Sequence, residues 1–415
     1  MSAPGYSAGA MELHRDFSGR ALVVLLGCMV CQLGAGLFYA TQALAPDVIG
    51  ELGWTRAMWS SAMAPMLLVS SVAQAFVGGA CVRFGVRPVI VCAVLLLGAA
   101  FLVLVQVREL WHFYVAMTLL ALANAGIGDV SIGAVVTRWF DRARGFALGI
   151  ALVGSNIGGV VLVHLVAVLS ETGSWREAAL RVGLGAVALI LPVALFAIRE
   201  PRIGEGALGE VQIEDAAEAP RAQGISLARA IRRPALWLFV LTVFAYSLAQ
   251  LGTVNHLVLY LMDLGYSKRE AAGALELAMG AGIASKLGAG LVALRLTPRI
   301  ALVCNTAMLA LAFVVIPFAE HPIALLVFGL LFGVATAARD VLVPLLLADV
   351  FGVRYFAQIY GVVMVAYFPG GGLGPGVIGY IHDVFGSYEP VFAGVALLLG
   401  VAALGLLRLA NSERR

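Results

Sequence analysis

Long apolar runs separated by short polar segments dominate the chain. Each run approaches the roughly 20 residues that an α-helix needs to cross the hydrocarbon core of a bilayer, and charged residues, glycine and proline mark its ends. The pattern predicts twelve membrane-spanning helices, numbered here in chain order, at residues 20–44, 58–80, 88–107, 112–136, 146–169, 181–198, 235–262, 271–294, 300–319, 323–347, 357–381 and 390–409.

The composition agrees with a chain that is surrounded mostly by lipid. Hydrophobic residues make up 61% and charged residues 12% of the sequence, whereas an ordinary soluble domain carries about 25% charged residues. The first apolar run is too long for the core of a signal peptide, so we interpret it as a retained first helix. We therefore expect an all-α membrane protein whose main partner is the lipid bilayer.

The lysines and arginines predict the orientation, because cytoplasmic loops carry an excess of them. With a cytoplasmic N-terminus, nineteen of the 27 fall on the cytoplasmic side and six on the outer side. Both termini are then expected in the cytoplasm. Lys286 and Arg339 are the two basic residues that remain within the membrane.

The one long hydrophilic interior segment, 199–234, divides the chain into two halves. It holds six arginines and six acidic residues, so we interpret it as a solvated linker and expect no nucleic-acid partner. The expected organisation is a cytoplasmic tail at 1–19, a six-helix bundle at 20–198, the linker at 199–234, a second six-helix bundle at 235–409 and a tail at 410–415.

Landmarks repeat between the two halves at a nearly constant offset. Arg83 and Arg87 after helix 2 correspond to Arg295 and Arg299 after helix 8, at an offset of 212 residues. In helix 4, Asp129 precedes a phenylalanine by 11 residues, and Asp340 does the same in helix 10, at an offset of 211. The repeat predicts two pseudo-symmetric bundles of six helices.

Twelve spans in two parallel halves, with a basic turn after helices 2 and 8, resemble the major facilitator superfamily. The turn "GACVRFGVRP" is similar to that family's Gly-x-x-x-Asp-Arg-x-Gly-x-Arg pattern, except that Val82 occupies the aspartate position. Leu294 stands at the same place in the second half. The resemblance implies cytoplasmic gate turns, with their basic residues at Arg83, Arg87, Arg295 and Arg299.

Three longer segments resemble a narrower branch, the bacterial monocarboxylate and oxalate/formate transporters. They are "TRWFDRARGFALGIALVGSNIGG" (137–159), "NHLVLYLMDLGYSKREA" (255–271) and "YGVVMVAYFPGGGLGPGVIGYIHDVFGSY" (360–388). The resemblance implies a secondary active transporter in a bacterial inner membrane that moves a small organic anion by alternating access. The glycine runs within these segments lack the strand and the Lys-Ser/Thr of a phosphate loop, so we interpret them as close-packing helix surfaces.

Ionisable groups deep in the membrane are restricted to a few helices. Helices 3, 6, 9 and 12 carry no charge and no histidine there, and the deep groups lie on helices 4, 5, 7, 8 and 10 at Asp129, His164, His256, Glu276, Lys286, Arg339 and Asp340. A charge facing lipid at mid-depth would cost about 2.5–3.5 kcal/mol or more. In the family that the chain resembles, the third helix of each trio faces lipid and the others line a central cavity, which accounts for this segregation.

Lys286 is the main candidate for contact with substrate. It lies about 12 Å from the cytoplasmic end of helix 8 at a rise of 1.5 Å per residue, which is too far for its side chain to reach the interface without strain. One hypothesis is that Lys286 neutralises a substrate carboxylate; the other is that neighbouring residues hold it and it serves packing alone. The resembling branch carries a cation, usually arginine, at the matching position.

Asp340 and Asp129 lie at a depth similar to that of Lys286, and either could hold its charge or carry a proton. Arg339 stands next to Asp340, so a structural charge pair is the alternative. Further candidates for the pocket are His256, with Asn255 before it, and Gln42, Tyr39, Tyr246 and Tyr367. The oxalate/formate transporters carry a lysine near Tyr367, so its absence favours a single carboxylate over a dianion.

Taken together, these patterns predict a transporter for a small monocarboxylate, coupled to protons. Efflux of amphipathic compounds is the alternative within transport, and a transporter-like membrane sensor or a membrane enzyme is an alternative from another class. No metalloprotease, serine-hydrolase or metal-ligand motif supports an enzyme, and we expect no cofactor and no metal. We expect the protein to be monomeric.

Overall fold

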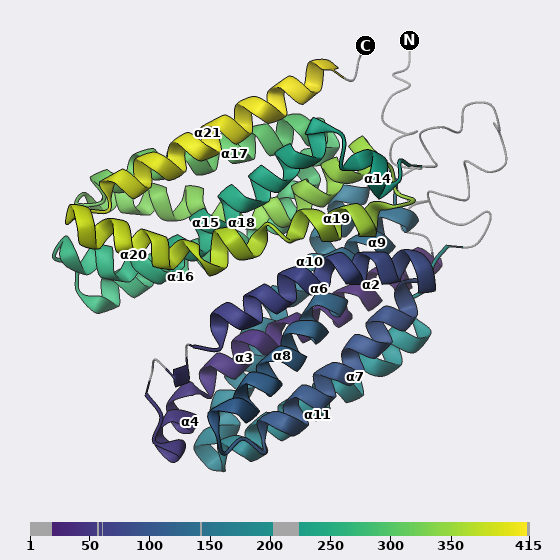
Figure 1. Cartoon of the computed structure of the whole chain (residues 1–415), viewed down its shortest axis with the longest axis vertical. Helices are drawn as coiled ribbons and strands as arrows, with labels where there is room; N and C mark the ends of the chain where they lie inside the picture. The colour runs from purple at the N-terminus through teal and green to yellow at the C-terminus, as the bar shows by residue number, and fades with distance from the viewer. Residues whose placement is uncertain (1–18, 56–57, 60, 142, 202–223, 413–415) are drawn as a thin grey trace, which may run out of the picture. The chain divides into compact units, whose positions relative to one another are not determined.

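The computed structural model describes residues 19–55, 58–59, 61–141, 143–201 and 224–412, and every regular element within these ranges is a helix (Figure 1). The prediction of an all-α protein is thereby confirmed. Of the expected segments outside the bundles, residues 1–18 of the first tail, 202–223 of the linker and 413–415 of the last tail lie outside the described residues.

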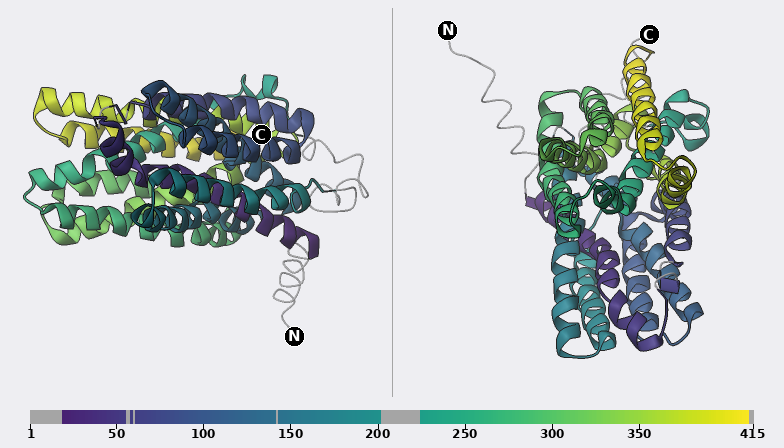
Figure 2. Two further views of the ribbon diagram at one scale, coloured as in Figure 1. Left: turned by 90° about the horizontal axis from the view of Figure 1, so that it is seen from below. Right: turned by 90° about the vertical axis from the view of Figure 1, so that its left-hand side faces the viewer.

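The chain divides into two units. One comprises Met1–Ile225 together with Phe351–Gly361, and the other comprises Ser226–Val350 together with Val362–Arg415. We describe each unit by itself, and within each the helices run side by side (Figure 2).

The first unit contains the first six expected spans, and some of them are built from more than one element. Its helices are α2 (Gly19–Leu33), η1 (Gly34–Gly36), α3 (Leu37–Ala43), α4 (Ala45–Leu52), α6 (Met63–Phe84), α7 (Val86–Leu104), α8 (Leu110–Ile127), α9 (Asp129–Trp139), α10 (Arg144–Thr172) and α11 (Trp175–Phe196).

The second unit contains the other six spans, apart from the first residues of helix α19. Its helices are α14 (Leu227–Ala230), α15 (Pro234–Asp263), α16 (Lys268–Arg295), α17 (Pro298–Val315), η2 (Ile316–Phe318), α18 (Pro322–Phe351), α19 (Phe356–Met364), η3 (Phe368–Gly372), α20 (Gly374–Phe385) and α21 (Glu389–Ser412).

Eleven helical segments in the described part of the chain are long and apolar enough to cross a membrane. Their bounds lie within a few residues of the expected ones, as in Pro234–Asp263 against 235–262. The remaining expected span, 271–294, is present as the 28-residue α16 but is not among the eleven. Alanine and glycine dominate α16, and Glu276 and Lys286 lower its mean hydropathy.

Local sequence signals explain where α16 begins. The Ser267 hydroxyl accepts a hydrogen bond from the Glu270 backbone N–H, and the Glu270 carboxylate accepts one from the Ser267 backbone N–H at 2.9 Å. This capping box satisfies donors that the first turn of a helix leaves open. The hydrogen bonds from Ser267 also hold the pKa of the Glu270 carboxyl below its usual value.

Three of the spans are interrupted within the membrane. The first changes to a 3₁₀ turn at Gly34–Gly36 between α2 and α3. The fourth is broken at Gly128, whose extended backbone ends α8 and precedes α9. The eleventh contains the π-helix η3 at Phe368–Gly372 between α19 and α20. Breaks of this kind place polar side chains and free backbone groups at depths where a continuous helix would not.

Glycines in the first unit allow α10 to approach α2 at backbone distance. A Cβ atom on Gly154 would overlap the Met29 carbonyl, and one on Gly158 would overlap the Leu33 carbonyl. Both glycines belong to the run "GSNIGG", so the interpretation of that run as a packing surface is confirmed. Gly370 of the second run packs in the same way against Ser247 of α15.

A polar cluster joins α4, α7 and α11 in the first unit. The Glu51 carboxylate pairs with the Arg176 guanidinium and accepts a hydrogen bond from the Trp175 indole at 2.6 Å. Arg176 also donates to the Val105 and Val107 carbonyls at the end of α7. The hydrogen bond from Arg176 lowers the pKa of the Glu51 carboxyl.

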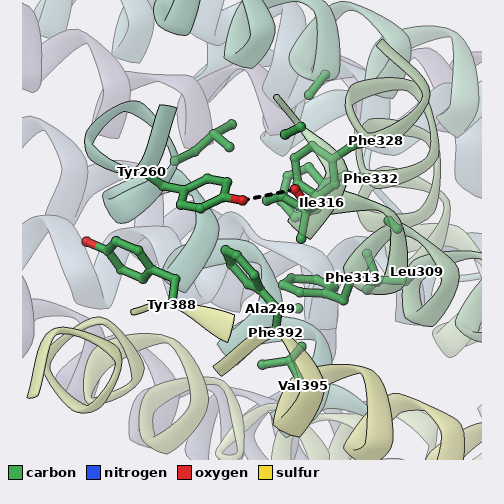
Figure 3. Close-up of a cluster of buried hydrophobic side chains, with 14 of the residues drawn as sticks. Ala249, Tyr260, Leu309, Phe313, Ile316, Phe328, Phe332, Tyr388, Phe392 and Val395 are labelled. Atoms are coloured by element: carbon green, nitrogen blue, oxygen red, sulfur yellow. Dashed lines mark hydrogen bonds between the residues drawn. The ribbon is translucent and has the colours of Figure 1, made fainter. Parts of the chain in front are cut away.

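An aromatic cluster fills the core of the second unit (Figure 3). Tyr260 of α15 packs edge-on against Phe392 of α21, and its hydroxyl donates to the Ile316 carbonyl at 3.1 Å. Phe313, Phe328 and Phe332 continue the cluster onto α17 and α18. These large side chains hold the helices that carry the charged groups described next.

Candidate functional site

Helices α16 and α18 bring two of the charged residues within the membrane into contact. The Lys286 ammonium lies 3.1 Å from Asp340 Oδ2, and the Arg339 guanidinium pairs with the other oxygen of the same carboxylate. Lys286 is 6% and Arg339 is 5% exposed, so both cations are buried. Of the two acids considered as partners of Lys286, Asp340 is in contact with it.

Small residues make this contact possible. Gly333 of α18 lies so close to Ala278 of α16 that a Cβ atom would overlap the Ala278 backbone. About two turns further along α16, the Ser285 hydroxyl donates to the Val334 carbonyl of α18 at 2.6 Å. The backbones of the two helices therefore approach closely, and the Lys286 side chain reaches Asp340 across the contact between them.

The cluster places two cations against one carboxylate. Lys286 and Arg339 are both buried and both contact Asp340. Buried cations are costly unless they are paired, so a carboxylate is the kind of group that such a cluster accommodates. The Asp340 main chain is also unusual, because Pro344, four residues later within α18, has no N–H to donate to the Asp340 carbonyl.

A fourth predicted residue joins the same cluster. The Arg339 guanidinium lies over the Tyr367 ring, 5.7 Å from its centroid. Tyr367 immediately precedes the π-helix η3, and π-helical turns often occur at functional sites. The candidate site of the second unit, which we call the Lys286 cluster, is therefore Lys286, Arg339, Asp340 and Tyr367.

The first unit has a polar pair of its own, in which Gln32 is buried and Asp129 is half-buried. Asp129 is the first residue of α9, directly after the break at Gly128, and its carboxylate accepts a hydrogen bond from Gln32 Nε2 of α2 at 3.2 Å. Gln32 is 1% exposed. Sequence reasoning missed Gln32, and the available signal was a lone amide in an otherwise apolar helix.

Two other predicted residues of the first unit lie near the end of α3. Gln42 accepts a hydrogen bond from the Trp59 indole at 3.3 Å. Tyr39 is 49% exposed and packs edge-on against the neighbouring Phe38 ring.

The remaining predicted residues of the second unit contact other partners. His256 Nε2 lies 2.8 Å from the Pro375 carbonyl, and its Nδ1 lies 3.3 Å from the Tyr388 hydroxyl. The adjacent Asn255 amide donates to the Leu251 carbonyl of its own helix. The Tyr246 hydroxyl is fully buried and accepts a hydrogen bond from the Asn305 amide at 2.8 Å.

His256 also lines a mostly apolar pocket with an empty volume of about 330 Å³ beside the aromatic cluster. The lining comes from α15, α17, η2, α20 and α21, and it includes none of the residues of the Lys286 cluster. The structure therefore places His256 and the Lys286 cluster in separate surroundings within the second unit.

In the first unit, a carboxylate from outside the basic-turn motif contacts the turn. Glu200, after α11, pairs with Arg138 of α9 at 2.6 Å and accepts a hydrogen bond from the Val86 backbone N–H at 3.4 Å. Arg87 donates to the Ile198 carbonyl at 2.6 Å. In the sequence, Val82 occupies the position where the resembling motif has an aspartate, and Glu200 supplies a carboxylate to the same turn.

The other basic residues of the two turns make fewer contacts. Arg83 lies over the Phe84 ring, 5.1 Å from its centroid, Arg295 is exposed, and Arg299 is half-buried near the start of α17. Among the described residues, no group of three or more His, Cys, Asp or Glu side chains is arranged to hold a metal ion.

Comparison with known proteins agrees with this architecture. A model of the Major Facilitator Superfamily matches residues 24–319, more than half of the chain. Monocarboxylate transporter 13 of Bos taurus is 27% identical over 335 residues, which cover 78% of this chain and 74% of that protein. Monocarboxylate transporter 11 of Mus musculus is 26% identical over 384 residues, which cover 87% and 80%.

Among solved structures, the E. coli fucose:proton symporter superposes with a TM-score of 0.73 at 16% sequence identity. The match covers 94% of this chain and 98% of that chain. At this identity the likeness concerns the fold alone, and it agrees with the expected arrangement of twelve helices.

Proposed function

Because the chain belongs to the Major Facilitator Superfamily, a family of membrane transporters, we propose that it moves a small organic monocarboxylate across the membrane by alternating access, together with a proton. That the chain is a multi-pass membrane protein and not an enzyme follows from the family itself. The substrate class and the proton are the proposal.

One observation carries the choice of substrate: two buried cations lie together at one carboxylate. Lys286 and Arg339 both contact Asp340, and a substrate carboxylate would bind to the same two cations. Arg339 adds the planar, two-pronged guanidinium that suits a carboxylate, and Lys286 adds a mobile point charge. Relatives named monocarboxylate transporters support the same class.

The other predicted contacts belong to this proposal with less support. Tyr367 adjoins the Lys286 cluster through Arg339. His256, Asn255 and Tyr246 of the second unit, and Tyr39 and Gln42 of the first, remain predictions for residues that shape the pocket. The predicted monomeric state and the bacterial inner membrane also remain predictions, and the relatives from cattle and mouse lend the latter no support.

Efflux of amphipathic compounds is the second candidate, and one observation favours it. Lys286 is held by Asp340, and a lysine that is held by an acid need not meet a substrate anion. The two candidates differ in the expected effect of removing the lysine charge. If the protein transports carboxylates, the loss abolishes transport; if it exports neutral amphipaths, the loss leaves efflux largely unchanged.

The test is uptake of labelled lactate, pyruvate and an aromatic monocarboxylate into proteoliposomes with an imposed pH gradient. We expect Lys286→Ala to reduce uptake at least about tenfold, because about 1.4 kcal/mol of lost anion binding already gives that factor, and Lys286→Arg to retain part of it. Glu276→Gln is the matched control, since Glu276 is an exposed acid on the same helix. Full uptake by Lys286→Ala would overturn the proposal.

Efflux is measured in parallel with a neutral fluorescent amphipath. Export of this dye by the wild type, unchanged in Lys286→Ala, together with no uptake of any carboxylate, would establish the second candidate instead.

A further inference from the structure

We infer that Asn305 of α17 is a positioning residue for the Lys286 cluster. It fixes the turn of α18 that leads into Arg339, and in this way it sets how tightly the cluster binds a substrate carboxylate. The inference rests on the proposed function and concerns the geometry of the same binding site.

Asn305 is a buried amide on a helix without deep charges. Its helix, α17, corresponds to the ninth expected span, one of the four that carry no charge and no histidine within the membrane. Asn305 is 5% exposed, and its Nδ2 donates to the Ala335 carbonyl of α18 at 2.9 Å and to the Tyr246 hydroxyl of α15 at 2.8 Å. A buried amide is costly unless it is hydrogen-bonded. Asn305 therefore ties α17 to both α15 and α18.

The turn of α18 that precedes Arg339 accepts side-chain hydrogen bonds at four consecutive carbonyls. These carbonyls belong to Phe332, Gly333, Val334 and Ala335. The first two accept from the hydroxyl of Thr336, within α18 itself. The third accepts from Ser285 of α16 and the fourth from Asn305 of α17. This turn of α18 is therefore held by donors from two neighbouring helices.

The Ala335 carbonyl connects this turn to Arg339. In a regular α-helix each backbone N–H donates to the carbonyl four residues earlier, and for Arg339 that carbonyl belongs to Ala335. Asn305 therefore holds the peptide group to which the Arg339 backbone is bonded. Ser285 directly precedes Lys286 in α16, so the second contact fixes α18 beside the lysine. Together the two contacts fix the two cations of the cluster relative to each other.

The Tyr246 hydroxyl provides a second link to Arg339. It accepts from Asn305 and donates to Thr306 Oγ1 at 3.2 Å, and the Thr306 hydroxyl donates to the Leu302 carbonyl at 2.8 Å. Each donor in this chain has an acceptor, and a fully satisfied buried network is rigid. Arg339 is close enough to the Tyr246 hydroxyl to act on it electrostatically. The network therefore adjoins the guanidinium as well as the backbone of Arg339.

The binding of a carboxylate depends on where the Arg339 guanidinium points. Two parallel hydrogen bonds from a guanidinium to a carboxylate require the two groups to be aligned, and a displacement of about 1 Å is enough to weaken such an interaction strongly. A shift of Arg339 relative to Lys286 therefore weakens substrate binding, although both charges remain in place. The expected signature is a higher half-saturating substrate concentration with nearly the same maximal rate.

The test uses Asn305→Leu, which has nearly the same size and no hydrogen-bonding group. Uptake of labelled lactate, pyruvate and an aromatic monocarboxylate into proteoliposomes is measured over a range of concentrations. We expect a half-saturating concentration about tenfold higher than that of the wild type and a maximal rate per folded transporter within about threefold. Asn305→Gln, which keeps the amide, should recover part of the affinity. An unchanged half-saturating concentration, or a loss of maximal rate alone, would overturn the inference.

Asn305→Ala is assayed beside Asn305→Leu, because a smaller side chain avoids the overpacking that could prevent folding. The same rise in half-saturating concentration is expected, and wild-type affinity in Asn305→Ala would count equally against the inference. Thr336→Val is the matched control, since it removes a buried hydroxyl from the same turn that donates within its own helix. It should bind substrate like the wild type. An equal rise in Thr336→Val would mean that any disturbance of the turn weakens binding and that Asn305 has no special role.

A measurement without substrate separates this inference from the proposed function. The melting temperatures of the wild type, Asn305→Leu, Arg339→Met and the double variant form a cycle, and the effects of two changes add only when the sites are independent. We expect Asn305→Leu to lower the melting temperature less in the Arg339→Met background, because the guanidinium that the network holds is then absent. Thr336→Val should have the same effect in both backgrounds.

The two failures are then distinguishable. If the wild type transports no monocarboxylate and the cycle is non-additive, the proposed substrate is wrong and the coupling of Asn305 to Arg339 stands. If the effects of Asn305→Leu and Arg339→Met add as well as those of Thr336→Val and Arg339→Met, Asn305 does not position Arg339, whatever is transported.

Discussion

Lys286 and Asp340 form a buried ion pair across two helices of the second unit, with 3.1 Å between the ammonium nitrogen and a carboxylate oxygen. The same carboxylate also meets Arg339, so the pair is one side of a group of three charges. The contact with Asp340 accounts for how a charge is tolerated in a glycine- and alanine-rich helix.

Removal of the shared carboxylate should be more damaging than removal of one cation. Asp340→Asn removes the carboxylate that both buried cations contact and should cost about 3–5 kcal/mol of stability. Lys286→Met leaves Arg339 paired with Asp340 and should cost clearly less. Thermal melting of the purified variants in detergent measures the difference, with Glu276→Gln as the control. Equal losses in the two variants would contradict the three-charge description.

The stability that Glu51 provides should depend on pH. The hydrogen bond from Arg176 lowers the pKa of Glu51 in the folded protein below its unfolded value, which is about 4.3 for an ordinary glutamate. Its contribution is therefore fully present above that value and disappears as the pH falls through the lowered pKa. The melting temperature of Glu51→Gln should lie below that of the wild type near neutral pH, and the gap should close in acid.

Glu177→Gln is the matched control for this experiment. Glu177 also pairs with an arginine, Arg181 at 3.1 Å, but both side chains are exposed, at 60% and 63%. Exposed ion pairs contribute little to stability, so Glu177→Gln should have the melting temperature of the wild type at every pH. A gap for Glu51→Gln that does not change with pH would mean that packing, not charge, is what the substitution removes.

Close approach of α10 and α2 should depend on Gly154. A Cβ atom there would overlap the Met29 carbonyl, so Gly154→Ala should force the helices apart and cost about 1–3 kcal/mol. At Gly185 of α11 a Cβ atom meets nothing within 4 Å, and Gly185→Ala should be neutral or slightly stabilising. Melting temperatures of the two variants test this, and similar values for both would refute the packing role of Gly154.

Glu200 should stabilise the basic turn of the first unit. Arg138 is largely buried while Glu200 is 43% exposed, so loss of the pair in Glu200→Gln should cost about 0.2–1 kcal/mol. Arg83→Gln is the comparison, because Arg83 is exposed and its guanidinium lies over the ring of the adjacent Phe84. Unfolding monitored by thiol labelling of the buried Cys81, next to the turn, compares the two variants. A larger effect for Arg83→Gln would mean that Glu200 does not take the place of the missing aspartate.

Several features of the site could be predicted from the sequence, and others could not. The lysine within the membrane was evident because the other lysine of the chain and nearly every arginine lie in polar segments. Its contact with Asp340 was not, because Asp129 and Asp340 lie at similar depths and only the packing of α16 on α18 brings Asp340 to the lysine. Gln32 was missed because an uncharged amide hardly changes the hydropathy of a helix, although it donates a hydrogen bond to Asp129.

The sequence by itself determined the number, order and approximate bounds of the spans, because a segment in lipid must satisfy its backbone within its own helix and must be apolar over its whole length. These are local requirements, and they are legible residue by residue. Tertiary structure alone decided the break at Gly128, the π-helix beside Tyr367, the Glu200 contact and the sharing of Asp340 by two cations. Each of these depends on which helix faces lie against each other, and close packing of small residues from distant parts of the chain settles that.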